Sequence, residues 1–250
     1  HQMALPGRMS PTSVLHMLLR GLWGESVYRR RLAAFVDELI GREGVQLVEA
    51  PDTPAEMVAY APTRHPRVPF VVRLHGPTSV LELLDRNVPE TVRRAMAWLE
   101  RRQMLRATHL TCPSQAGASW IRQTLRLGSR AIAAYPNPPT VATAPSSAPQ
   151  PEAEDPDLLL FVGRLTRSKG VETLVRAMPA VLDRCPEARL VLVGPDYPTQ
   201  QPFASTEAHL RHLMTPSAQA TVSFTGYLPP EQLAAYYRRA AVCVLPSLFE

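Results

Sequence analysis

Short, almost continuously apolar segments alternate with helix-period segments along most of this 250-residue chain. A strand that is apolar at successive positions is buried on both faces, which is typical of a parallel sheet covered by helices on both sides. The sequence therefore predicts an α/β fold built on parallel sheets. The predicted strands are 45–48, 69–74, 108–112, 131–135, 158–162, 189–193, 221–224 and 242–245.

The intervening segments carry apolar residues at helical spacing. They predict helices at 12–23, 25–40, 53–60, 88–106, 114–127, 170–183, 206–214 and 229–239. In open parallel sheets, ligands bind beyond the carboxyl ends of the strands. His75-Gly76, Ser114 and Asn137 fall at such strand ends, and Ser114 is also a candidate N-cap.

Residues 139–156 interrupt this alternation with a stretch rich in Pro, Ala, Ser and Thr that has no periodicity. We interpret it as a linker between a domain at 1–138 and a domain at 157–250, because long structureless loops within one domain are uncommon. A long surface loop within one domain is the alternative. The first domain has no opening strand, and the second stops directly after a strand, so we expect a chain truncated at both ends.

The charge of the chain is divided unevenly. Residues 1–140 hold 18 Arg against 11 acidic residues, a net charge of +7, whereas 141–250 hold 8 Arg and one Lys against 11, a net charge of −2. The basic half could face anionic lipid or a phosphorylated acceptor, or it could be an Arg-rich solvated surface. Nucleic acid is not an expected partner, because interleaved aromatics and any zinc-finger or helix-turn-helix signature are missing.

Three cysteines, Cys112, Cys185 and Cys243, lie far apart and show no metal or redox spacing. Each lies in an apolar segment, so we expect small buried hydrophobes in a reducing, cytoplasmic setting. No apolar run approaches the ~20 residues of a membrane span, and the N-terminus has no signal-peptide layout.

A strand, a short loop and a helix meet at 161–170, where two glycines and several cations gather. The loop contains Gly163-Arg164 and Lys169-Gly170, and Lys169 is the only lysine among 27 Lys and Arg residues. A helix N-terminus offers unpaired N–H groups and a partial positive charge. With cations beside it, this join is suited to an anion, most plausibly a phosphate. The lone lysine by itself would indicate only an exposed, charged helix start.

Further motifs follow this loop in order. They are Leu190-Val191-Leu192-Val193-Gly194, Val222-Ser223-Phe224-Thr225-Gly226-Tyr227-Leu228, Glu231-Gln232-Leu233, Tyr236 or Tyr237, and Pro246-Ser247-Leu248-Phe249-Glu250. Together with the 163–170 loop, this set resembles the retaining glycosyltransferases of the GT-B fold, in the large family 4 group. The resemblance runs from about Val45 to Glu250. It implies two Rossmann-like domains that face each other across a cleft, with the second domain incomplete here.

By this resemblance the second domain binds a nucleotide-sugar and the first binds the acceptor. Arg164 and Lys169 would hold the donor diphosphate and neutralise the leaving group, so that neither a metal nor another cofactor is needed. Glu250 resembles the first Glu of the family's E-x7-E motif, near the donor sugar. His75 resembles a first-domain His that contacts the transferred sugar, although without the resemblance His75-Gly76 is more typical of a turn.

Gly163 and Gly194 complete the candidate donor site with Gly226 and Leu228, which resemble the loop around the nucleobase. The resemblance implies a metal-independent, hexosyltransferase-like enzyme of cell-envelope polysaccharide biosynthesis. It would move a sugar from a nucleoside-diphosphate-sugar to a polysaccharide, lipopolysaccharide or glycolipid precursor with retention of configuration. The 250-residue chain itself is expected to be inactive, because part of the donor site would be missing. The alternatives are another GT-B enzyme, such as a sugar-nucleotide epimerase or a phosphorylase, and a non-catalytic nucleotide-binding module.

Overall fold

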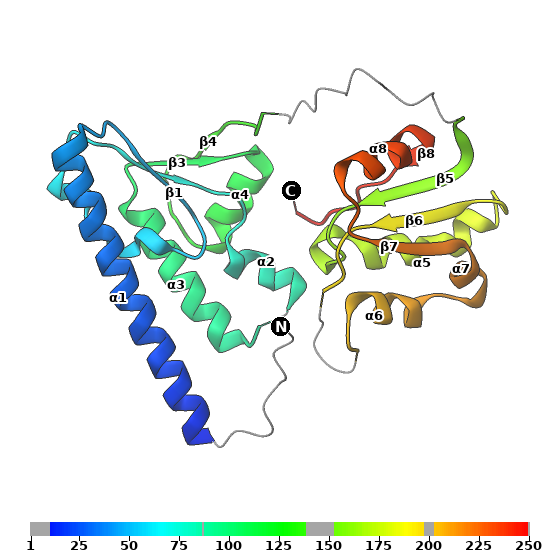
Figure 1. Cartoon of the computed structure of the whole chain (residues 1–250), viewed down its shortest axis with the longest axis horizontal. Coiled ribbons are helices and arrows are strands. Elements are labelled where there is room, and N and C mark those ends of the chain that lie inside the picture. Colours follow the sequence, from blue (N-terminus) through cyan, green and yellow to red (C-terminus); the bar gives the residue numbers. More distant parts are fainter. Residues whose placement is uncertain (1–10, 87, 139–152, 198–202, 250) are drawn as a thin grey trace. The chain divides into compact units, whose positions relative to one another are not determined.

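A computed structural model describes residues 11–86, 88–138, 153–197 and 203–249. The chain divides into two compact units, His1–Thr78 with Arg94–Pro136, and Ser79–Arg93 with Asn137–Glu250. Each unit is built on its own four-stranded sheet, and the helices of each pack around that sheet (Figure 1). The predicted α/β fold with parallel sheets is therefore confirmed. Of the predicted linker, residues 139–152 lie outside the described residues.

The sheet of the first unit has the strand order β1-β2-β3-β4, and all its strand pairs are parallel. Its strands are β1 (Val48–Pro51), β2 (Phe70–Arg73), β3 (His109–Cys112) and β4 (Ala133–Ala134). The strand predicted at 45–48 lies three residues further along the chain, because the buried residues of this segment begin at Val48. Val48 and Ala50 face the core, whereas Leu47 is 49% exposed.

The helical segments of this part of the chain differ most from prediction. They are α1 (Pro11–Glu43), the 3-10 turns η1 (Glu56–Ala59) and η2 (Pro62–Arg64), α2 (Thr78–Asp85), α3 (Glu90–Arg106) and α4 (Gln115–Thr124). The two helices predicted at 12–23 and 25–40 are one, because the intervening Gly24 costs only ~1 kcal/mol in a helix. The helix predicted at 53–60 is wrong, since Ala55 adopts a left-handed φ of 60° before η1. Helix α2 was not predicted. The Ser114 hydroxyl caps α4 as expected, accepting from Gly117 N–H at 3.0 Å.

The sheet of the second unit has the order β7-β6-β5-β8, again with parallel pairs throughout. Its strands are β5 (Asp155–Val162), β6 (Arg189–Val193), β7 (Val222–Gly226) and β8 (Ala240–Cys243). Strand β5 begins inside the predicted linker, because Asp155 pairs with Ala240 and its carboxylate accepts from the Arg189 guanidinium at 2.6 Å.

The helices of this unit are η3 (Arg167–Lys169), α5 (Val171–Leu182), α6 (Thr206–Leu213), α7 (Pro216–Thr221) and α8 (Pro230–Arg239). Helix α7 was not predicted. Its N-cap is Thr215, whose hydroxyl accepts from Ala218 N–H at 3.3 Å. A threonine followed by proline is a typical helix start, so the local signal was present in the sequence.

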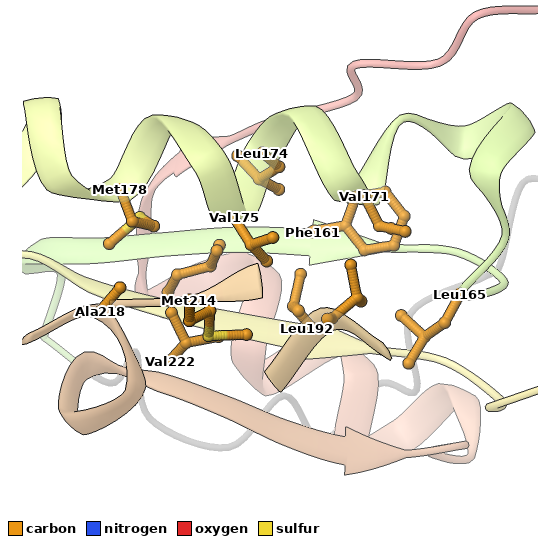
Figure 2. Close-up of a cluster of buried hydrophobic side chains, with 12 residues drawn as sticks. Phe161, Leu165, Val171, Leu174, Val175, Met178, Leu192, Met214, Ala218 and Val222 are labelled. Atoms are coloured by element: carbon orange, nitrogen blue, oxygen red, sulfur yellow. The ribbon is translucent and has the colours of Figure 1, made fainter. Parts of the chain in front are cut away.

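The core of the second unit lies between α5 and the sheet, where the labelled side chains meet in Figure 2. Val171, Val175 and Met178 lie on one face of α5, at a spacing of three or four residues, and are at most 1% exposed. Phe161 and Leu192 come from the two central strands and are fully buried. Each such side chain contributes roughly 1.5–3 kcal/mol by leaving water. This packing fixes where α5 begins relative to the end of β5.

The cysteine prediction is confirmed for one residue of three. Cys112 is buried on β3, whereas Cys185 and Cys243 are exposed. Cys243 lies on β8, an edge strand of its sheet, and Cys185 lies in the turn after α5. Among the described residues, no helix has the length and hydropathy to cross a membrane.

Candidate functional site

Three of the predicted glycines meet at the edge of the second sheet where its parallel strands end. Gly163 follows β5, Gly194 follows β6, and Gly226 ends β7. The N–H of Gly163 donates to the carbonyl of Val193 at 2.9 Å, and the N–H of Gly194 donates to the carbonyl of Gly226 at 2.9 Å. The structure thus places these glycines side by side, where a doubly wound sheet offers its ligand-binding edge.

Gly194 is required by this close approach. Its φ is +149°, and a Cβ at this position would lie 1.8 Å from the carbonyl oxygen of Gly163. No side chain can be accommodated at that distance without moving backbone. The glycine therefore keeps the loop after β5 close to the end of β6.

The loop after β5 closes into a tight turn before α5. The N–H of Lys169 donates to the Thr166 carbonyl at 3.1 Å, and the N–H of Gly170 donates to the Arg167 carbonyl at 2.9 Å. Gly170 has a left-handed φ of 71° and serves as N-cap of α5 without a side-chain hydrogen bond. Because glycine has no side chain, the N-cap residue leaves the first N–H groups of α5 without a side-chain cap.

Both predicted cations lie on this loop. Arg164 is exposed, and Lys169 is half-buried one residue before the N-cap of α5. Glu172 is the acidic residue in the first turn of α5, but its carboxylate lies 3.3 Å from Nε2 of His209 on α6. The helix N-terminus carries a partial positive charge. Together with the two cations, it forms an electropositive loop suited to a phosphate.

The segment that follows β8 packs directly against this turn. A Cβ on Gly170 would lie 1.9 Å from the carbonyl oxygen of Pro246, and the N–H of Leu248 donates to the carbonyl of Ser168 at 2.8 Å. The segment leads to Glu250, which lies outside the described residues, so its role stays a prediction. Leu228, predicted near the nucleobase, is half-buried in the connection between β7 and α8.

The remaining predicted site residue, His75, belongs to the first unit. It is exposed and lies two residues after the end of β2, at the carboxyl edge of that sheet, as the sequence predicted. The loop that carries it is held by Asp52, which follows β1. Asp52 Oδ2 accepts from Gly76 N–H at 3.1 Å, and Asp52 N–H donates to the Arg73 carbonyl at 3.1 Å.

Asp52 is fully buried, and this burial raises its pKa to about 6. Backbone N–H groups around the carboxylate, that of Gly76 first, act in the opposite direction and lower the pKa. Sequence reasoning missed Asp52 as a site residue. The available signal was an acidic residue immediately after a strand, at the edge where His75 also lies.

In the part of the chain that the structure describes, no group of three or more His, Cys, Asp and Glu residues could hold a metal ion. The expected metal independence rests on the resemblance and stays a prediction.

Comparison with known protein families identifies both halves of the chain. Residues 4–138 match the family model described as glycosyl transferase 4-like domain, and residues 156–250 match glycosyl transferases group 1. The chain is 37% identical over 98 residues to an uncharacterized glycosyltransferase of Methanocaldococcus jannaschii, which is 39% of this chain and 23% of the relative. It is 32% identical over 96 residues to the D-inositol 3-phosphate glycosyltransferase of Corynebacterium glutamicum, which is 37% of this chain and 22% of the relative. The matches thus span less than a quarter of these relatives.

Solved structures of GT-B glycosyltransferases share the fold. Sucrose-phosphate synthase from Thermosynechococcus elongatus superposes with a TM-score of 0.56 at 22% identity, over 88% of this chain and 54% of that one. The catalytic domain of starch synthase IV from Arabidopsis thaliana, bound to ADP and acarbose, superposes with a TM-score of 0.53 at 15% identity. The match covers 89% of this chain and 56% of that one. Anabaena HepE in complex with UDP and glucose superposes with a TM-score of 0.51 at 20% identity. The match covers 82% of this chain and 55% of that one. Because the 4-like family model spans more than half of the sequence, the chain belongs to this family of glycosyltransferases.

Proposed function

We propose that the 163–170 loop binds the diphosphate of a nucleotide-sugar donor for a metal-independent glycosyltransferase that retains configuration. The observation that carries the proposal is the geometry of this loop. It brings Arg164, Lys169 and the N-terminus of α5 to the strand edge where Gly163, Gly194 and Gly226 meet. Two structural neighbours bind ADP or UDP in their solved complexes, which supports a nucleoside diphosphate as the ligand class.

The chemistry follows from where charge develops. When the bond between the sugar and the diphosphate breaks, negative charge accumulates on the leaving oxygen. Arg164 and Lys169 would stabilise that charge, as would the N–H groups at the start of α5. Two side-chain cations can supply the neutralisation that a divalent metal supplies in other phosphate sites, so the proposed reaction needs no metal. His75 and Glu250 would contact the transferred sugar.

The acceptor side of the proposal rests on the resemblance. We propose a glycan or glycolipid precursor of the cell envelope as acceptor, with the reaction at the cytoplasmic face of the membrane. One curated relative is named for a phosphorylated acceptor, D-inositol 3-phosphate. An acceptor that carries a phosphate would suit the basic character of the first half of the chain.

Peripheral contact with an anionic membrane surface belongs to the same proposal. A pocket of about 430 Å³ between α1 and α3 is lined by Arg29, Arg30, Arg102, Arg106 and Trp98, among others. Trp98 is 60% exposed, and the Arg102 guanidinium lies 5.3 Å from its ring centroid. Arginine and tryptophan side chains are favoured at headgroup level. Cosedimentation with phosphatidylglycerol vesicles but not with phosphatidylcholine vesicles is the expected result, and equal partitioning would refute the contact.

The test of the donor site compares the deletion of two cations that flank opposite ends of α5. UDP, ADP and GDP are titrated by calorimetry into the wild-type chain and into Lys169→Ala and Arg184→Ala. Arg184 is an exposed cation just beyond the opposite end of α5. Loss of a charge-assisted contact should weaken the preferred nucleotide about 10- to 100-fold in Lys169→Ala. Arg184→Ala should leave its affinity within about twofold, because exposed charges at that distance are screened. Unchanged affinity in Lys169→Ala would refute the proposed site.

A further inference from the structure

The turn that carries Lys169 is held by an acidic side chain from a distant part of the sequence. Asp85 Oδ1 accepts from the backbone N–H of Ser168 at 2.6 Å, and Asp85 Oδ2 accepts from the Ser168 hydroxyl at 3.0 Å. Both residues belong to the same compact unit, although 83 positions separate them. One carboxylate thus takes both hydrogen-bond donors of a single residue in the proposed phosphate loop.

Nothing in helix α2 itself favours an acidic residue at this position. Asp85 is its last residue, and a negative charge at a helix C-terminus is electrostatically unfavourable. Arg86 then takes a left-handed φ of 57°, its N–H donates to the Glu82 carbonyl at 3.1 Å, and Val88 N–H donates to a Glu82 carboxylate oxygen at 3.2 Å. These bonds end the helix without Asp85. The contact with Ser168 therefore explains an acidic residue at this position better than the end of the helix does.

Ser168 is the junction of several contacts. It is 2% exposed, and its hydroxyl lies 2.9 Å from that of Thr166. A hydroxyl has one hydrogen, and that of Ser168 is given to Asp85, so Thr166 must be the donor in this pair. The result is a directed chain from Thr166 through Ser168 to the carboxylate, in which each bond polarises the next. The Ser168 carbonyl in turn accepts from Leu248 N–H at 2.8 Å.

We propose that Asp85 is a positioning residue for the donor diphosphate. By holding the N–H and the hydroxyl of Ser168, it fixes the 167–169 turn and thereby the direction in which Lys169 leaves the backbone. This role rests on the proposed function, because it is defined by the diphosphate that Lys169 would hold.

Two substitutions separate the hydrogen bonds from the charge. In Asp85→Asn the amide oxygen still accepts from Ser168 N–H, and the amide NH2 donates to the Ser168 hydroxyl, which turns toward Thr166. Its geometry is kept while its charge is lost. In Asp85→Ala the N–H and the hydroxyl of a buried residue lose their acceptor together. Asp183→Ala, which removes an exposed carboxylate at the C-cap of α5, is the matched control.

The first measurement is calorimetric titration of the 250-residue chain with UDP, ADP and GDP. Asp85→Ala should bind the preferred nucleotide about 5- to 30-fold more weakly, as expected when a buried hydrogen-bonded pair is broken. Asp85→Asn should remain within about threefold of wild type, because the amide keeps both contacts with Ser168. Asp183→Ala should do so because an exposed carboxylate contributes little. Tighter binding by both Asp85 variants would overturn the proposal, because it would mean that the carboxylate only repels or competes with the phosphate.

The second measurement needs no ligand. Amide hydrogen exchange of Ser168, followed by NMR, should accelerate about 10-fold or more in Asp85→Ala and stay near wild type in Asp85→Asn. Unchanged exchange in Asp85→Ala would refute the positioning role. If Lys169→Ala leaves nucleotide affinity unchanged, the proposed function fails, whatever Asp85 does. If Lys169→Ala loses affinity and Asp85→Ala does not, the donor site stands and only this inference fails.

Discussion

The carboxyl group of Asp52 should make the first unit less stable as the pH rises. Its pKa is raised from 3.8 to about 6 by burial, so the folded state binds its proton more tightly than the unfolded state does. The contribution of this group is full below pH 3.8 and is lost as the pH rises through 6. Over the whole range it amounts to about 3 kcal/mol, at about 1.36 kcal/mol per pKa unit, and about 2 kcal/mol of it falls between pH 4.5 and 7.5.

Asp52→Asn removes this titration and keeps an acceptor for Gly76 N–H. Other titrating groups are common to both proteins, so the difference in unfolding free energy between the variant and wild type isolates Asp52. We expect that difference to shift in favour of the variant by about 2 kcal/mol from pH 4.5 to 7.5. All three tryptophans, Trp23, Trp98 and Trp120, lie in the first unit. Urea unfolding followed by tryptophan fluorescence therefore reports on the unit that contains Asp52.

A neutralising substitution at an exposed neighbour controls for the loss of a charge. Glu49 lies on β1, three residues before Asp52, with its side chain exposed. Glu49→Gln should differ from wild type by no more than about 0.5 kcal/mol at each pH, as surface changes usually do. A flat difference for Asp52→Asn would refute the reasoning, because it would mean that burial does not penalise the ionised carboxylate. A shift of opposite sign would mean that the surrounding N–H groups outweigh burial.

Two further predictions concern packing. Gly194→Ala should destabilise the second unit by about 2–4 kcal/mol in thermal unfolding followed by circular dichroism, because a Cβ meets backbone at 1.8 Å and φ is +149°. Gly128→Ala, with φ +64° and nothing within 4 Å of the added Cβ, should cost only about 1–2 kcal/mol, and equal losses would contradict the steric argument. In thiol labelling of the native chain, Cys185 and Cys243 should react first. Cys112 should react only on unfolding, because it is buried and burial raises its pKa. Equal labelling rates for all three thiols would contradict this prediction.

The parts of the fold that sequence could predict are those set by local pattern. The strand at 189–193 and the helix after Gly170 have continuous or helical apolar spacing and were found within a residue or two. The strand near Val48 was misplaced, because several apolar residues follow one another there and only pairing with β2 selects the buried ones. Helix α2 was missed because its 8 residues are too few for apolar residues at helical spacing to be recognised in the sequence.

The candidate site shows the same division. The glycines and cations of the 163–170 loop are close in sequence, so the order of strand, loop and helix was enough to predict them. Asp52 and Asp85 were missed because each acts on residues far along the chain, at 24 and 83 positions. A single acidic residue has no local pattern that distinguishes such a role from solvent exposure. Only the folded backbone brings each carboxylate to its donors.

The contact between Gly170 and Pro246 links two stretches that would otherwise be independent. With no side chain between them, the backbone after β8 cannot shift without displacing the turn that carries Lys169. The mobility of the two stretches is therefore coupled. A ligand that reduces the mobility of the turn carrying Lys169 should reduce the mobility of residues 246–248 to the same degree. The two stretches should open together as one cooperative unit in exchange experiments. A loop held in this way is ordered before a ligand binds, so less of the binding free energy is spent on ordering it.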